Sequence, residues 1–230
     1  MPRRPRIQLD GVPLHIVQRG HHREACFFAE QDYHTYLQAL QLALADSHCA
    51  LHAYALMPNH VHLLLTPKRA EVVPRLIISL GRRYGQHINT HYWHDGPLWD
   101  SRYKSSPIDA ASYLLTCQRY IELNPVRAAL VDDPAHYRWT SYRANALGQG
   151  DDVLAPHGVY TGLGKSPGQR QSAYRALFRA GLKAETIGEI RLALNQNQPL
   201  GNARFLGRVA RLTGERRVAR PRGRPRLGAV

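Results

Sequence analysis

The sequence predicts an α+β fold in which helices pack on an antiparallel sheet of ferredoxin-like type, followed by a small helical C-terminal extension. Two observations predict this fold. Short apolar runs typical of strands alternate along the chain with longer runs whose apolar residues recur every three or four positions, as in amphipathic helices. Two of the short runs meet at Pro58-Asn59, and these residue types favour a tight turn between paired strands. Strands joined by short turns and interspersed with helices are typical of this fold class.

The expected elements follow one another as strand, helix, strand, strand, helix, strand, helix. Strands are expected over residues 14–20, 50–57 and 60–66, with a short one that follows residues 98–104. Helices are expected over residues 31–48, 71–90 and 110–124. Asp109 is the expected N-cap of the third helix. Pro125 should end or kink that helix at Asn124, because proline disfavours helical geometry at the residue before it.

The C-terminal part of the chain carries weaker patterns. Gly148 to Gly168 contains Gly and Pro residues and is expected to be a linker. Apolar residues at helical spacing within residues 169–214 predict three short helices. We therefore expect a main domain over residues 1–148, a helical extension over 149–214 and a basic disordered tail over 215–230.

The charge of the chain indicates a polyanionic partner. The 230 residues carry a formal net charge of +14, with a pI near 10.2. Such a balance favours nucleic acid first and an acidic membrane surface second. The charge is uneven, because residues 204–230 hold nine arginines and a single acid, Glu215.

Cysteine usage and hydropathy indicate the compartment. Cys26, Cys49 and Cys117 are scattered and form no Cys-x-x-Cys pair, so neither a disulfide framework nor a structural zinc site is predicted. Each is expected to be a small core residue. No apolar run reaches the ~18 residues of a membrane helix, and the basic N-terminus lacks the apolar segment of a secretory signal. We expect a cytoplasmic protein with no membrane partner.

Two histidines and a tyrosine are the candidate chemical groups. Side chains alternate along a strand, so His60 and His62 should point the same way, about 7 Å apart, and could share one divalent metal ion. The alternative is two satisfied histidines at a sheet surface. Tyr120 and Asn124 should lie one turn apart on one flank of the third helix. Metal-assisted cleavage of a phosphodiester needs a nucleophile and a Lewis acid. Tyr120 can be the nucleophile, and Asn124 can be a third ligand beside the two histidines.

Two segments of the sequence resemble a known family. Residues 56–64, LMPNHVHLL, and residues 119–128, RYIELNPVRA, resemble the two signature blocks of the single-tyrosine HUH transposases. Residues 96–103 and 139–142 are similar to further blocks of the REP-associated tyrosine transposases, and the resemblance covers about residues 13–148. Many relatives have Gln where this chain has Asn124.

The resemblance implies an activity and a site. It implies cleavage and rejoining of single-stranded DNA at hairpin-forming repeats, with a 5′-phosphotyrosine formed on Tyr120 and a freed 3′-hydroxyl. It also implies a Mg²⁺ or Mn²⁺ ion held by His60, His62 and Asn124. The expected partners are single-stranded DNA and DNA hairpins, bound by a monomer or a homodimer.

Several basic residues are candidate DNA contacts. Aromatic and basic residues interleave over residues 98–104, as in grooves for single strands, although a sheet edge has a similar composition. The basic candidates are Arg19, Arg82, Arg83, Arg102, Lys104, Arg222 and Arg224. The last two lie in Pro-Arg-Gly-Arg-Pro, which resembles the core of an AT-hook, a motif that places arginines in a narrow A·T minor groove. The alternative is a disordered basic tail that binds any nucleic acid.

Two other function classes compete with the enzyme. One is a non-catalytic DNA-binding protein derived from a transposase, and the presence of the complete set of site residues argues against it. The other is an RNA-binding protein, which should carry aromatic pairs on the sheet face where this chain has histidines. His91 and His94 have the i, i+3 spacing of a metal pair, but Asp95-Gly96-Pro97 should break a helix there, so we expect no ligand role for them.

Overall fold

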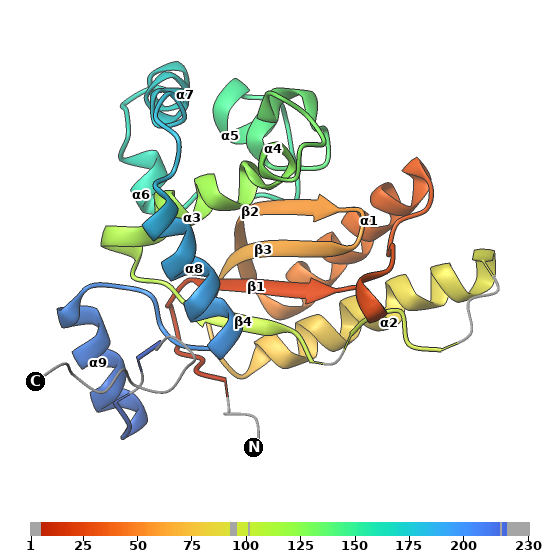
Figure 1. Ribbon diagram of the computed structural model, residues 1–230, viewed down its shortest axis with the longest axis horizontal. Coiled ribbons are helices and arrows are strands. Elements are labelled where there is room, and N and C mark those ends of the chain that lie inside the picture. Colours follow the sequence, from red (N-terminus) through yellow and green to blue (C-terminus); the bar gives the residue numbers. More distant parts are fainter. Residues whose placement is uncertain (1–5, 93–95, 101, 217, 220–230) are drawn as a thin grey trace, which may run out of the picture.

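A four-stranded antiparallel sheet forms the centre of the molecule (Figure 1). The computed structural model describes residues 6–92, 96–100, 102–216 and 218–219. The strands are β1 (Leu14–Arg19), β2 (Cys49–Met57), β3 (His60–Pro67) and β4 (Lys104–Pro107), arranged in the order β2-β3-β1-β4. Every neighbouring pair is antiparallel. This order and the helices between the strands confirm the predicted ferredoxin-like α+β fold.

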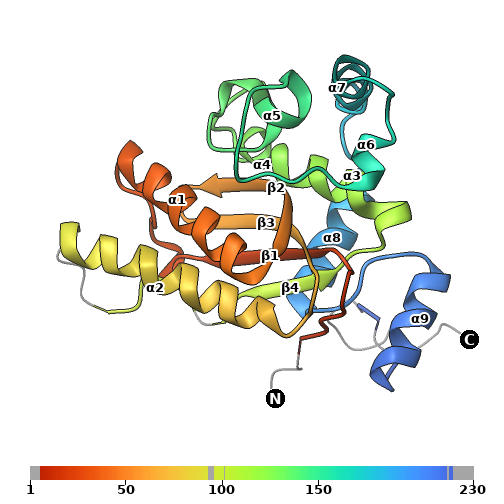
Figure 2. The ribbon, with the colours of Figure 1, turned by 180° about the vertical axis from the view of Figure 1, so that it is seen from behind.

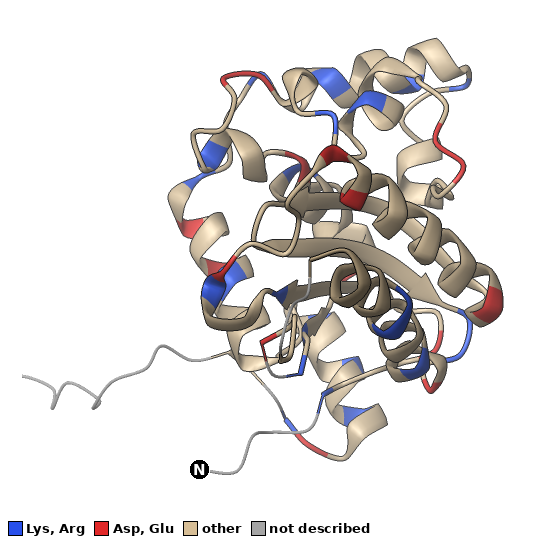
Figure 3. Ribbon diagram, turned by 90° about the vertical axis from the view of Figure 1, so that its right-hand side faces the viewer, with Lys and Arg blue, Asp and Glu red and all other residues tan. Residues whose placement is uncertain are grey.

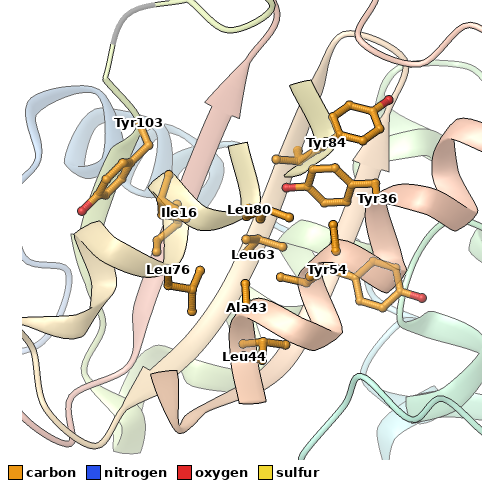
Figure 4. Packing of buried hydrophobic residues seen from close by; sticks show 14 of the residues in the cluster. Ile16, Tyr36, Ala43, Leu44, Tyr54, Leu63, Leu76, Leu80, Tyr84 and Tyr103 are labelled. Carbon is orange, nitrogen blue, oxygen red and sulfur yellow. The ribbon is translucent and has the colours of Figure 1, made fainter. Parts of the chain in front are cut away.

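Two long helices cover one face of the sheet (Figure 2). They are α1 (Glu30–Ser47) and α2 (Val72–Tyr92). The apolar stripe of α2 is buried as predicted, whereas on α1 Leu40 and Leu44 are buried and Tyr33 and Leu37 are only partly buried. Tyr36, Leu80 and Tyr84 meet Ile16 and Leu63 of the sheet in the main core (Figure 4). Because alternate residues of each strand point into this core, the intervening residues face the other side of the sheet.

That other face is covered by α3 (Ala110–Glu122) and α8 (Ala184–Gln196), and α8 crosses in front of the sheet in Figure 1. Ala53 and Ala55 of β2 are fully buried beneath α3. Their short side chains leave room for the helix to lie close to the sheet. This approach brings the end of α3 next to the histidine-bearing strand β3.

The end of α3 differs from the expected boundary. The helix stops at Glu122, Leu123 makes a turn, and a short helix α4 (Asn124–Arg127) follows. Pro125 has no N–H to continue the helical hydrogen bonds, so the helix breaks two residues earlier than predicted. Asp109 occupies the N-cap position of α3 as expected, but its side chain makes no capping hydrogen bond.

The C-terminal region contains the three predicted helices and additional short ones. The predicted helices are α7 (Pro167–Ala176), α8 and α9 (Ala203–Thr213), and the additional ones are α5 (Tyr142–Leu147) and α6 (Gly158–Thr161). Two 3-10 turns, η1 (His21–Arg23) and η2 (Pro134–His136), lie earlier in the chain. The expected linker therefore includes α6. It also runs beside the edge strand β2, where the N–H of Ala155 donates to the carbonyl of Leu51 at 2.7 Å.

The burial of the cysteines agrees with the prediction that they are core residues. Cys26, Cys49 and Cys117 are all buried and free, as predicted for core residues. Among the described residues, no helix is both long enough and apolar enough to span a membrane.

Candidate active site

His60 and His62 lie side by side on β3, on the face covered by α3. Their ring centroids are 5.0 Å apart, and Val61 between them is buried in the opposite core. The predicted alternation is therefore confirmed. Arg19 pairs with His60 across the sheet, and Val17 pairs with His62. The two imidazoles thus lie at the centre of the sheet, beside the end of β1.

Hydrogen bonds fix the orientation of both rings. Nδ1 of His60 donates to Oδ1 of Asn59 at 2.6 Å, and the amide of Asn59 is itself oriented by donating to the carbonyl of Arg23 at 3.2 Å. This leaves Nε2 of His60 unprotonated. Nδ1 of His62 lies 2.8 Å from Nε2 of the buried His15. When His62 supplies the shared proton, its own Nε2 carries the lone pair that a metal ion needs.

Burial keeps these histidines neutral. Desolvation lowers the pKa of His60 to about 4 and that of His15 to about 3, with Arg19 and Arg127 adding to the shift at His60 and Arg127 at His15. The pKa of His62 lies well below its usual value, first through desolvation and then through the neighbouring histidines and arginines. A neutral imidazole is the form that binds metal ions, so the site is ready for a ligand role at neutral pH.

Tyr120 and Asn124 reach the histidines from above the sheet. Tyr120 is 5% exposed, and its ring centroid lies 6.0 Å from that of His62 and 5.8 Å from that of His15. Nδ2 of Asn124 lies 3.3 Å from Nε2 of His60 and donates to it, so the amide and the imidazole are in direct contact. The break at Leu123 does not separate the tyrosine from the asparagine, because α4 continues beside the sheet.

Arg127 lies behind the tyrosine. Its guanidinium carbon is 4.1 Å from the centroid of the Tyr120 ring. All three guanidinium nitrogens are buried without a well-formed hydrogen bond among the described residues, and the Tyr120 side chain is the polar neighbour of the group. Burial lowers the pKa of Arg127, although an arginine stays charged at neutral pH. The site therefore holds a positive charge with which no carboxylate of the described residues forms an ion pair.

The site opens onto a pocket of about 550 Å³. His60, His62, Tyr120 and Asn124 all line it. Lysines and arginines occur on many parts of the ribbon (Figure 3). Among the residues that line the pocket, basic side chains outnumber acidic ones. Its charged residues are Arg19, Arg23, Arg102, Lys104, Arg191 and one acid, Asp100. A concave wall of this charge focuses a positive potential on the tyrosine and favours a polyanionic ligand.

A family comparison shows which family the chain belongs to. The family model described as "Transposase IS200 like" matches residues 9–124, just over half of the chain, and this segment includes the histidines, the tyrosine and the asparagine. The chain belongs to the IS200-like transposase family. Transposases of this family generally use a divalent metal ion.

One solved structure shares the fold of this IS200-like transposase. A REP-associated tyrosine transposase bound to a REP hairpin matches with a TM-score of 0.57 and 15% identity, covering 68% of this chain and 93% of the other. A putative transposase from Deinococcus radiodurans R1 is 22% identical, with a TM-score of 0.37, and covers 53% of this chain and 96% of the other. A search of functionally curated proteins found no significant match.

The donor set of the transposase suits a divalent ion. Two neutral imidazoles and one amide, whose oxygen could serve as a ligand, line the same pocket, and their number would leave coordination positions for phosphate oxygens and water. No group of three or more His, Cys, Asp or Glu residues that could hold a metal ion occurs in the described part of the chain. A site of two histidines and an asparagine is consistent with that result, because its third ligand is an amide.

The structure separates the predicted DNA contacts into groups. Arg19, Arg102 and Lys104 line the pocket with the four candidate site residues. Arg82 and Arg83 lie on α2, which covers the opposite face of the sheet, and Arg83 pairs with Asp46 at 3.2 Å. They take no part in the pocket wall. Arg222, Arg224 and His94 lie outside the described residues.

The sequence patterns did not single out several site residues. A signal for His15 is that this polar residue lies between the apolar residues Leu14 and Ile16 of a predicted strand, and it is fully buried in the structure. Arg127 stands in the RYIELNPVRA block but was assigned no role. Arg191 carries no local signal, since its place in the pocket depends on where α8 packs.

Proposed function

We propose that this transposase cleaves and rejoins single-stranded DNA at hairpin-forming repeats, using Tyr120 as the nucleophile. One observation carries the proposal. Two segments far apart in the sequence bring a buried tyrosine, two neutral histidines and an asparagine amide to one basic pocket. A structural core alone has no need of this combination. The REP-associated relative binds a REP hairpin, which supports hairpin DNA as the substrate class.

The proposed reaction balances as a transesterification. The phenolic oxygen of Tyr120 attacks the scissile phosphorus and loses its proton to solvent. The bond from phosphorus to the 3′ oxygen of the preceding nucleotide breaks, and that oxygen takes up a proton. The products are a 5′-phosphotyrosine and a free 3′-hydroxyl, and the reverse reaction rejoins a strand without an energy source.

The remaining site residues assist this reaction. A Mg²⁺ or Mn²⁺ ion held by His60, His62 and Asn124 would polarise the phosphate and stabilise the charge that develops on it. The basic wall would hold the flanking phosphates, and the ring of Tyr120 is positioned by Arg127. Because one chain supplies every member of this set, a monomer can carry out the cleavage.

Covalent trapping tests the nucleophile. Single-stranded DNA with a palindromic hairpin and single-stranded arms, labelled at its 3′ end, is incubated with the protein and Mg²⁺ or Mn²⁺. A labelled adduct that survives denaturation is expected, because the tyrosine keeps the 5′ phosphate of the labelled fragment. Tyr120→Phe removes only the phenolic oxygen, so it should abolish the adduct and leave hairpin affinity within about twofold.

The matched control is Tyr113→Phe. Tyr113 lies on the same helix, where its hydroxyl donates to Glu189 at 3.1 Å outside the pocket, so this variant should form the adduct normally. An undiminished adduct from Tyr120→Phe would remove Tyr120 from the mechanism. If the wild type binds the hairpin tightly but forms no adduct with either metal ion, the protein is instead a non-catalytic DNA-binding protein.

A further inference from the structure

Helix α8 forms one wall of the candidate active site. It lies outside residues 9–124, the segment matched by the family model. Ile190 and Ala193 are buried in the core between the helix and the sheet, and Leu194 is buried at the pocket. The polar residues Arg191 and Asn195 line the pocket that contains Tyr120. The two pocket residues are four positions apart, so they lie one turn apart on the same side of the helix.

Hydrogen bonds attach the end of α8 to the edge strand β4. Asn197 ends the helix in a left-handed conformation, and its Oδ1 accepts from the N–H of Ser105 at 3.0 Å. The Ser106 hydroxyl donates to the carbonyl of Gln198 at 2.6 Å, and the N–H of Leu200 donates to the carbonyl of Pro107 at 2.8 Å. These bonds hold α8 against the sheet and fix the distance of its polar side from the histidines.

The polar side of α8 has the charge that a nucleic-acid strand needs. Nζ of Lys104 donates to Oδ1 of Asn195 at 2.7 Å, so the helix also orients a lysine of the pocket. Arg191 is exposed and has no ion-pair or hydrogen-bond partner in the described part of the chain. Arg191 shares the pocket wall with Arg19, Arg23 and Arg102, against one acid among the lining residues, Asp100.

The buried guanidinium of Arg127, which packs on the Tyr120 ring, adds a further positive charge at this site. Such an excess of cations is unfavourable unless a negative charge neutralises it. A phosphodiester strand that enters the pocket beside Tyr120 would supply this charge. The helix side carrying Arg191 and Asn195 is then the surface along which the strand lies.

We propose that α8 positions the single-stranded DNA arm for cleavage, with Arg191 contacting a phosphate next to the scissile one. The inference rests on the proposed function and deepens it, because it assigns strand placement to a helix outside the family-matched segment. Phosphate contacts of this kind fix the register of the strand without reading its bases. Arg191 should therefore act on the arm and leave recognition of the hairpin duplex unchanged.

The test compares two DNA ligands. Binding is measured by fluorescence anisotropy in a Tyr120→Phe background, which prevents turnover, on a hairpin with a single-stranded arm and on the same hairpin without it. Arg191→Gln should weaken binding of the armed hairpin about tenfold, as expected for loss of one charged hydrogen bond, and leave the armless hairpin unchanged. The slope of log affinity against log salt on the armed hairpin should fall by about 0.7.

Arg75→Gln is the matched control, because Arg75 is an exposed arginine of α2 on the opposite face of the sheet. It should change neither affinity. The inference is overturned if Arg75→Gln weakens binding as much as Arg191→Gln does, or if Arg191→Gln weakens binding of both hairpins equally. Either result would show that affinity depends on the overall charge of the protein.

Adduct formation separates this inference from the proposed function. If the otherwise wild-type protein forms the adduct and Arg191→Gln changes neither adduct yield nor arm affinity, the role of α8 is wrong and the nuclease proposal stands. If no adduct forms but Arg191→Gln still loses arm affinity selectively, the nuclease proposal fails and the strand-binding role of α8 stands.

Discussion

Glu122 is a fully buried carboxyl whose replacement by glutamine should change how stability depends on pH. It lies two residues after Tyr120 and is 0% exposed. Ser141 and Asn145 donate to its Oε1 at 2.7 and 2.8 Å, and the hydroxyl of Tyr174 donates to its Oε2 at 2.8 Å. One side chain therefore connects α3 to α5 and α7.

Burial outweighs these hydrogen bonds. Desolvation raises the pKa of Glu122 from 4.5 to about 7, although the three donors oppose the shift. A raised pKa means that the folded state holds the proton more tightly than the unfolded state. The stability due to this group is therefore complete below about pH 4.5 and is lost as the pH rises through about 7.

The size of the effect follows from the shift. Each pH unit in this window removes about 1.4 kcal/mol, so the wild type should lose about 3 kcal/mol between pH 4.5 and pH 7 through Glu122 alone. The buried histidines His15, His52 and His60 have lowered pKa values, so their contribution rises with pH and opposes this loss. Subtracting the Glu122→Gln curve from that of the wild type cancels the histidine contribution.

Urea unfolding in EDTA, repeated from pH 4.5 to 8, measures this difference. The stability of Glu122→Gln relative to wild type should increase by about 3 kcal/mol across the range. Glu185→Gln changes an exposed carboxyl at the start of α8 and should show no such trend. A difference that stays constant within about 0.5 kcal/mol for Glu122→Gln would show that the carboxyl does not titrate as its burial requires.

Three further predictions concern the site and the tail. EDTA or His62→Ala should suppress adduct formation, whereas His91→Ala, at an exposed residue of α2, should not; cleavage that continues in EDTA would exclude the metal site. Arg127→Lys removes the planar group that packs on the Tyr120 ring, so the adduct should form up to about 100-fold more slowly while hairpin affinity stays within about twofold; an unchanged rate would refute this positioning role. Truncation after Gly214 should weaken duplex binding and flatten its salt dependence. If residues 215–230 bind only through charge, the loss of affinity should be equal on A·T-rich and G·C-rich DNA. If Arg222 and Arg224 form an AT-hook, the loss should be larger on A·T-rich DNA.

Local sequence patterns determined much of the candidate site. Strand alternation is a property of the extended backbone, so it was enough to place His60 and His62 on one face and Val61 on the other. Helical spacing likewise kept Tyr120 and Asn124 together, although the proline broke the helix earlier than expected. The sequence also predicted the buried side of α2 and part of that of α1, because the periodicity of apolar residues indicates which side of a helix is buried.

Only the tertiary structure decided which elements meet. Periodicity shows which side of a helix is buried but not what it is buried against, so Arg82 and Arg83 could not be separated from Arg19 and Arg102 by sequence alone. His15 reaches His62 because β1 lies beside β3 in the sheet. Arg191 lines the same pocket as the tyrosine because hydrogen bonds to β4 hold α8 across the sheet. Contacts between segments so distant along the chain depend on the packing of whole elements, and a local pattern cannot encode them.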